Sequence, residues 1–260
     1  MYEFLQDLLS DKKGGLAFTC FGLYHVIYMA IIFGGILGVI LLLKNKSETV
    51  KKRATDAALY TAFGLYMADF FLMPFAYGEI DVEKLPFHAC TAMCLCCFLS
   101  RHNSFFGRFK DQFVLLGLLS NLIYVVYPAG VGWYGVHPLC YRVWQTLLYH
   151  GTMTAFGVFS LAFGDVKLAW RKCPGDLALL SVMTAWALAG NTLYNGLDER
   201  FFNWFFVVRD PFYILPEAIA PFIMPFLMVA VMFAGEMLIY LVYFGCLRLW
   251  GKHENKSPPL

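Results

Sequence analysis

Residues 17–43 read AFTCFGLYHVIYMAIIFGGILGVILLL and contain no Asp, Glu, Lys or Arg. A helix needs roughly 20 mostly apolar residues to cross the ~30 Å hydrocarbon core of a bilayer, and this stretch is longer than that. Hydrophobic residues make up 60% of the 260-residue chain, whereas charged residues make up only 15%. The composition therefore predicts an integral membrane protein.

Further apolar segments follow, and they lack the alternating pattern of barrel strands, so helices are expected to cross the bilayer. We predict an all-α, polytopic transmembrane helical bundle of about seven spans, at residues 17–43, 54–77, 85–100, 111–129, 141–164, 176–195 and 215–247. The third span is short for a crossing. The seventh is long enough to tilt or to be interrupted at Pro221 and Pro225. No linker or repeat divides the spans, so residues 1–260 are expected to form a single transmembrane helical domain.

The orientation follows from the loop charges, because Lys and Arg favour the cytoplasmic side. Most of the 20 basic residues lie at one set of span ends, notably within 44–53, 101–110 and 167–172. The opposite ends carry fewer, interleaved with acidic residues: Lys12, Lys13, Lys84, Arg142, Arg200 and Arg209. We therefore expect the N-terminus outside or in a lumen and the C-terminus in the cytoplasm. The expected location is a bacterial plasma membrane, in which the protein is multi-pass. The net charge of +2 gives no reason to expect a nucleic-acid partner, and the sequence does not indicate an oligomeric state.

Polar side chains within the spans gather near the predicted outer ends. They are His25, Asp69, His88, Cys90, Asn121, Gln145, His150, Asn191, Asn195 and Glu217, and only Glu236 lies near the cytoplasmic end. Ionisable groups inside a span usually face the bundle interior and mark a functional path. This pattern predicts a hydrated pocket that opens toward the outer face. For Asp69, Asn121 and Gln145 the alternative is a structural role, in which they only form hydrogen bonds between helices.

Cys90 is the best candidate nucleophile within this pocket. It lies in the first turns of a helix that begins near Leu85 and Pro86, where the helix dipole favours a thiolate. His88 is two residues away and would point elsewhere on a helix. The base should therefore come from another span, with His150 at matching depth or, less directly, His25.

Cys94 and Cys97 lie on the same helical face as Cys90, with Cys96 beside them. Zinc sites usually pair cysteines on loops at C-x-x-C spacing, whereas small cysteines pack well between membrane helices. We expect packing here, with no metal and no other cofactor.

Several elements resemble the YwaF-like integral membrane proteins, the group that includes transmembrane protein 164. Residues 85–90, LPFHAC, resemble the family's LPLHLC signature, and Tyr24-His25 matches its first-span histidine. Residues 145–151, QTLLYHG, resemble its Q-F-F-x-S-H-G element, and residues 191–207 are similar to its N-W-x-x-G-T-N-Y-x-x-L element.

The chain departs from the family pattern in three places. Thr91 replaces an acidic residue that often follows the cysteine. Residues 127–129, Tyr-Pro-Ala, replace a T-P-D turn, and Phe201-Phe202 replaces the Gly-Thr before the second Asn. These departures bear on the substrate and the efficiency more than on the fold.

The resemblance implies a lipid acyltransferase that uses Cys90 and His150 on phospholipid acyl esters near the outer face. A thioester would pass its acyl chain to a lysophospholipid, or to water in a hydrolase, with Asn191, Asn195 or His25 as oxyanion donors. Membrane lipids are thus the expected partners. The alternative function is a non-enzymatic permease or ligand-binding membrane protein, whose pocket uses His25, Asp69, Asn121 and His150.

Overall fold

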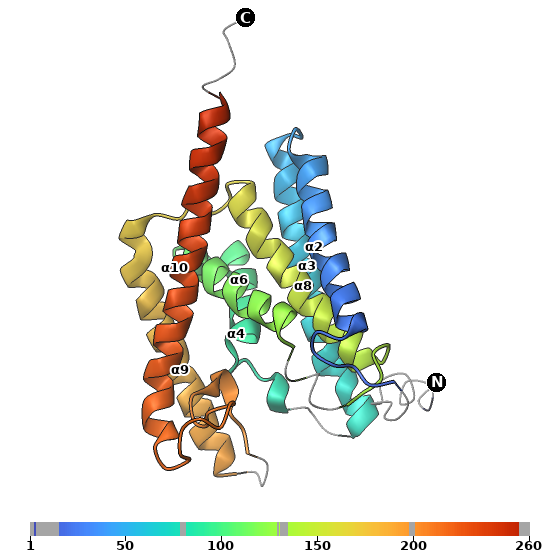
Figure 1. Cartoon of the computed structure of the whole chain (residues 1–260), viewed down its shortest axis with the longest axis vertical. Coiled ribbons are helices and arrows are strands. Elements are labelled where there is room, and N and C mark those ends of the chain that lie inside the picture. The colour runs from blue at the N-terminus through green and yellow to red at the C-terminus, as the bar shows by residue number, and fades with distance from the viewer. Residues whose placement is uncertain are drawn as a thin grey trace, which may run out of the picture. The chain divides into compact units, whose positions relative to one another are not determined.

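A computed structural model describes residues 3, 16–78, 82–128, 130, 135–197 and 201–254 of the chain (Figure 1). The α-helices are α2 (Leu23–Leu43), α3 (Glu48–Tyr77), α4 (Ala89–His102), α5 (Ser104–Gly107), α6 (Lys110–Val126), α8 (Tyr141–Ala162), α9 (Cys173–Asn195) and α10 (Ala220–Glu254). Short 3-10 helices are η1 (Val82–Lys84), η2 (Trp170–Lys172) and η3 (Trp204–Phe206). The all-α prediction is confirmed for these residues. Lys12, Lys13, Arg200 and residue 129 of the fourth predicted span lie outside them.

Each of the seven predicted spans corresponds to one α-helix, but only some of these helices have the length and apolarity needed to cross a bilayer. Among the described residues, four segments are long and apolar enough: Leu23–Leu43, Glu48–Phe75, Trp170–Asn195 and Ala220–Arg248. These support a membrane protein. Helices α4 and α6 have 14 and 17 residues, which at ~1.5 Å per residue gives only about 21 and 26 Å. Seven crossings and the orientation of the termini therefore stay predictions from the sequence.

The seventh predicted span forms one helix, α10, which runs on through the expected site of interruption. Pro225 lies inside α10, and Pro221 lies in its first turn, where proline is well tolerated because the first N–H groups of a helix have no partner within it. Helix α3 has a sharp end instead. Its C-cap Gly78 takes a left-handed conformation with a φ of 76°, which glycine adopts without the strain of a Cβ atom.

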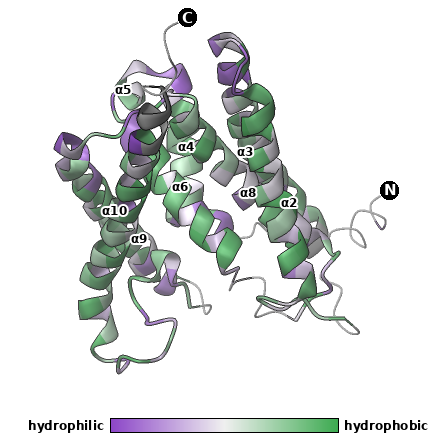
Figure 2. Ribbon diagram, turned by 45° about the horizontal axis from the view of Figure 1, so that its top comes forward, coloured by the Kyte–Doolittle hydropathy of each residue, from purple (hydrophilic) through white to green (hydrophobic). Residues whose placement is uncertain are grey.

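The chain divides into two compact units, Met1–Val166 and Lys167–Leu260. In the first unit, α8 packs against α2, α3 and α6, while α4 packs against α3 and α6 (Figure 1). Helix α8 carries polar residues yet has most of its side chains buried, whereas the strongly apolar α2 is largely exposed (Figure 2). This is the arrangement expected when lipid replaces water around the unit, because polar groups then avoid the surface.

Two glycines let neighbouring helices approach α8 closely. A Cβ atom at Gly157 would lie 2.6 Å from Leu118 Cβ on α6, and one at Gly151 would lie 2.9 Å from Ile32 on α2. Small residues allow such contacts between membrane helices. The close approach of α6 brings its polar residues within reach of those on α8.

An ion-pair network closes the end of the first unit that the sequence assigns to the cytoplasm. Arg101 Nη2 on α4 lies 2.6 Å from Asp165 Oδ2, just after α8, and Arg101 Nε lies 3.3 Å from Asp56 Oδ1 on α3. Lys110 on α6 reaches the other oxygen of Asp165 at 3.1 Å, and Lys52 reaches Asp56 at 2.6 Å. The network therefore joins four helices through two carboxylates.

The network makes stability depend on pH through Asp165. Burial disfavours the charged carboxyl, but Arg101 and Lys110 outweigh this and hold its pKa below its usual value of 3.8. A carboxyl whose pKa is lowered by folding adds stability above its unfolded pKa, and this stability is lost as the pH falls through the folded pKa. We expect the free energy of unfolding in detergent to fall below about pH 4, and to fall less in Asp165→Asn. The exposed Glu48→Gln variant serves as the control. If the free energy of unfolding fell equally with pH in wild type and in Asp165→Asn, Asp165 would not have this role.

In the second unit, α9 and α10 pack against each other, and η3 packs against both. The Tyr240 hydroxyl, in the second half of α10, donates to Asp176 Oδ2 in the first turn of α9 at 2.8 Å. The two helices are therefore antiparallel. Between them, Asp210 accepts hydrogen bonds from the backbone N–H groups of Phe212, Ile214 and Leu215, and these bonds hold the pKa of its carboxyl below the usual value.

Candidate functional site

His150 on α8 is held in a single orientation by Asn121 on α6. His150 Nδ1 lies 2.7 Å from Asn121 Oδ1, and the Asn121 amide nitrogen donates to the carbonyl oxygen of Gly117 at 2.7 Å. Because an amide oxygen only accepts, Nδ1 carries the proton of this bond. In the neutral ring, Nε2 then has a free lone pair. No hydrogen bond to Nε2 is present within the part of the chain that the structure describes.

Two aromatic rings pack against this imidazole. The Tyr124 ring stacks on it with a centroid distance of 3.9 Å and an angle of 16°, and the Tyr149 ring meets it edge-on at 4.8 Å. His150 is 5% exposed and Asn121 is fully buried. Packing and hydrogen bonding therefore fix both the ring plane and the tautomer, as a general base requires.

Cys90 is the second residue of α4, directly after Ala89, and His88 is the N-cap residue. Its sulfur interacts with the backbone N–H groups of Cys90 and Thr91, the position in which a helix N-terminus favours an anion. Cys90 is half-buried, whereas Cys94 and Cys97 are fully buried. Among the cysteines on this face of α4, Cys90 is thus the accessible one.

Tyr149 links the cysteine to the histidine. Its hydroxyl donates to the Cys90 carbonyl oxygen at 3.0 Å and also lies within hydrogen-bonding distance of the Cys94 sulfur, while its ring contacts the neighbouring His150. The Cys90 thiol and the His150 imidazole themselves share no hydrogen bond in this structure. They nonetheless belong to one region of the first unit, because Tyr149 contacts both the Cys90 backbone and the His150 ring.

Lys84 brings a positive charge to this region. Its ammonium interacts electrostatically with His88, Cys90 and His150. It is held by an ion pair with Asp69, in which Nζ and Oδ2 are 2.7 Å apart, and its carbonyl oxygen accepts a hydrogen bond from the Tyr66 hydroxyl at 2.8 Å. The predicted pocket residue Asp69 therefore positions a cation next to the cysteine.

Two other predicted pocket residues bind backbone groups within the first unit. His25 Nδ1 accepts from the Phe21 N–H at 2.9 Å, so Nε2 donates to the carbonyl oxygen of Val125, also at 2.9 Å. Gln145 Nε2 donates to the carbonyl oxygen of Leu65 at 3.2 Å. These contacts join neighbouring helices, which is the structural alternative that the sequence left open for Gln145.

Asn191 and Asn195 belong to the second unit, where they bind the segment that contains η3. Each side-chain amide exchanges two hydrogen bonds with one backbone residue, Asn191 with Trp204 and Asn195 with Phe202, at 2.6–3.0 Å. The two asparagines are one helical turn apart on α9, so they reach alternate residues of the segment. Their amide donors are thus engaged with the backbone, which leaves the oxyanion role suggested by the sequence without support.

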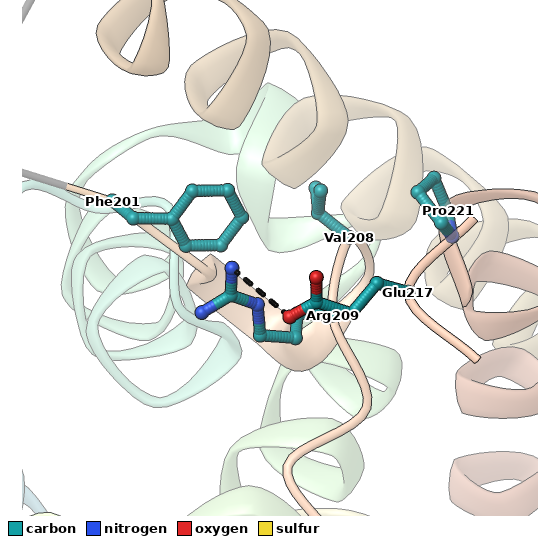
Figure 3. Close-up of a pocket in the computed structure, with 5 residues that line it drawn as sticks. All are labelled: Phe201, Val208, Arg209, Glu217 and Pro221. Carbon is teal, nitrogen blue, oxygen red and sulfur yellow. Dashed lines mark ion pairs between the residues drawn. The ribbon is translucent and has the colours of Figure 1, made fainter. Parts of the chain in front are cut away.

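Glu217 lies in a separate pocket of the second unit (Figure 3). Its carboxylate is 3.6 Å from Arg209 Nη2, and the Arg209 guanidinium lies 4.2 Å from the centre of the Phe201 ring. The pocket has a volume of about 220 Å³, and Val208 and Pro221 complete its lining.

The residues that connect the site were not among the site residues predicted from the sequence. Tyr149 and Tyr124 were not selected, although Tyr149 precedes His150 and Tyr124 follows Asn121 by almost one helical turn, so spacing could have suggested them. Lys84 was used only as a loop charge. Among the described residues, no three His, Cys, Asp or Glu side chains are placed to hold a metal ion together.

Comparison with protein-family models, curated proteins and solved structures finds no match to this chain. The resemblance to the YwaF-like proteins therefore stays a prediction from the sequence, and the function must be argued from the site.

Proposed function

We propose that the chain is a membrane-embedded enzyme that moves acyl chains from phospholipids to lysophospholipids or to water. In this proposal Cys90 is the nucleophile and His150 is the general base, while Asn121 is a positioning residue for His150. The proposal depends on the 2.7 Å hydrogen bond between His150 Nδ1 and Asn121 Oδ1. This bond keeps the proton of the neutral imidazole on Nδ1, so Nε2 is the basic atom. A nucleophile, a base and a group that orients the base form the usual set for acyl transfer.

The reaction has two steps. In the first, the Cys90 thiol gives its proton to His150 Nε2, and the sulfur attacks the ester carbonyl. The lysophospholipid oxygen leaves with that proton, and a thioester remains. In the second, a lysophospholipid hydroxyl or a water molecule gives its proton to His150 and attacks the thioester, and the thiolate then recovers the proton. Each step needs the thiol and the imidazole in contact, which catalytic groups often reach only once the substrate is bound.

Opposing influences act on the Cys90 sulfur. Burial disfavours its charged form, whereas the backbone N–H groups at the start of α4 and the ammonium of Lys84 favour it. The predicted orientation places this end of α4 beneath the outer headgroups, where the glycerol esters of phospholipids lie. The proposal thus retains a multi-pass protein of a bacterial plasma membrane with its N-terminus outside, and it requires no cofactor.

The permease alternative finds less support in the site. It needs His25, Asp69, Asn121 and His150 as free ligands for a solute. Both nitrogens of His25 already bind backbone groups, and Asp69 is paired with Lys84.

An acyl-enzyme intermediate provides the test. We expect the purified protein, given a phospholipid with an alkyne-tagged acyl chain, to gain a tag that hydroxylamine removes and that peptide mass spectrometry locates on Cys90. The tag should be absent from Cys90→Ser and present in Cys96→Ser, which alters a half-buried cysteine of the same helix. Tagging that survives in Cys90→Ser would refute the role of this thiol. Unchanged lipids together with altered solute uptake in Cys90→Ser cells would favour the permease.

A further inference from the structure

Two buried carboxyl groups lie together in the second unit, apart from the residues used above. Glu236 on α10 is 1% exposed, and Asp176 in the first turn of α9 is 2% exposed. The two groups are close enough to interact electrostatically. Both lie in segments that are long and apolar enough to span a membrane, where ionisable residues are costly and usually functional.

The packing of α9 and α10 directs both groups to the same place. Tyr240 follows Glu236 by one helical turn, so both side chains lie on one face of α10. The Tyr240 hydroxyl donates to Asp176 Oδ2 at 2.8 Å, which shows that this face packs against the start of α9. Cys173 contributes a thiol next to this position, with its sulfur 4.0 Å from Met237 Sδ.

Glu236 has an oxygen without a partner. Its Oε2 is buried and forms no hydrogen bond with any residue that the structure describes. A second negative charge beside Asp176, buried and without a hydrogen bond, would be strongly unfavourable. Binding a proton removes that charge.

We propose that the Asp176–Glu236 pair is a proton-binding site, with the exchangeable proton on Glu236 and the negative charge on Asp176. The hydroxyl of Tyr240 stabilises the charge on Asp176, because a hydrogen bond to a carboxylate favours its ionised form. Glu236, which receives no such bond, takes the proton. Among the residues that the structure describes, Asp176 interacts electrostatically with Glu236, and Cys173 of α9 and Tyr240 of α10 are the other titratable groups at this contact between the helices. This assignment gives the second unit a proton-exchange function that does not depend on acyl transfer.

Dicyclohexylcarbodiimide tests the site, because this apolar reagent modifies protonated carboxyl groups. The carboxyl proton moves to a carbodiimide nitrogen, the carboxyl oxygen bonds to the central carbon, and acyl migration then gives a stable N-acylurea. We expect peptide mass spectrometry of the full-length protein in lipid nanodiscs to find this adduct on Glu236 and not on the exposed Glu217. Above the labelling midpoint, the yield should fall about tenfold per pH unit.

Two variants test the separate roles of the two carboxyl groups. Glu236→Gln should lose the adduct. Asp176→Asn, which keeps an acceptor for Tyr240, should move the labelling midpoint to lower pH because the neighbouring negative charge is gone. Circular dichroism and gel filtration check that each variant is folded.

Several results would overturn the assignment. They are a folded wild type without the adduct on Glu236, a yield that does not change with pH, and an unchanged midpoint in folded Asp176→Asn. Protection by sodium chloride but not by choline chloride would show that the pair binds a metal cation instead of a proton. The wild-type pH profile decides the question even if a variant fails to fold.

Discussion

Replacing Asn121 with leucine is expected to slow acyl release from a phospholipid about 10²- to 10⁴-fold, nearly as much as His150→Ala. Leucine cannot accept the Nδ1 proton, so the imidazole is free to adopt the other tautomer and to rotate. In that tautomer the Nε2 atom carries the proton and cannot act as the base. Initial rates with a fluorescent phospholipid in nanodiscs measure the effect.

Matched variants separate catalysis from folding. Asn121→Asp keeps an acceptor for Nδ1 and should stay within about tenfold of the wild-type rate. Ser160→Ala, which removes a buried hydroxyl elsewhere on α8, should leave the rate unchanged. The double variant of Asn121→Leu and His150→Ala should be no slower than His150→Ala, because the two residues act as a unit. Additive losses, or a normal rate in folded Asn121→Leu, would show that Asn121 does not position His150.

Replacing Arg101 with methionine is expected to lower the free energy of unfolding by about 3 kcal/mol, the lower end of the range for removing one partner of a buried ion pair. The Arg101 side chain is 10% exposed and pairs with both Asp165 and Asp56. Without Arg101, the negative charges of the two carboxylates are less well balanced by positive charge, although Lys110 still pairs with Asp165. Reversible unfolding in mixed detergent micelles measures the change.

The exposed Arg108 provides the control for this prediction. Arg108→Met removes the same charge near the same end of the unit and should change the free energy of unfolding by less than about 0.5 kcal/mol. Equal effects of the two substitutions would mean that net charge, and not the network, stabilises this end.

Much of the helical pattern could be read from the sequence, because the length and apolarity of a segment are local properties. The predicted span 141–164 corresponds closely to α8, and the short third span corresponds to the 14-residue α4. For the long seventh span the sequence left tilting or an interruption at Pro221 and Pro225 open, and α10 is not interrupted at Pro225. A proline near the start of a long helix removes few hydrogen bonds, and the helix continues through it.

The site was predictable only in part. A position of Cys90 near a helix start was expected and is found, but the start itself differs: α4 begins at Ala89, so Pro86 lies before the helix and is not its first residue. The roles of Asn121, Asn191 and Asn195 could not be separated by residue type or depth, because an amide can bind an imidazole or a backbone segment equally well.

The sequence by itself determined an all-helical chain with helices apolar enough for a membrane and with a cysteine near a helix start, and it predicted a histidine at similar depth on another helix. Only the tertiary structure decided that Asn121 bonds to His150, that Tyr149 contacts both the histidine and the Cys90 backbone, and that Glu236 lies near Asp176. The reason is physical. Apolarity along one segment fixes where a helix forms, but contacts between helices depend on how each is rotated and how closely it packs, and residues as small as Gly151 and Gly157 set that approach.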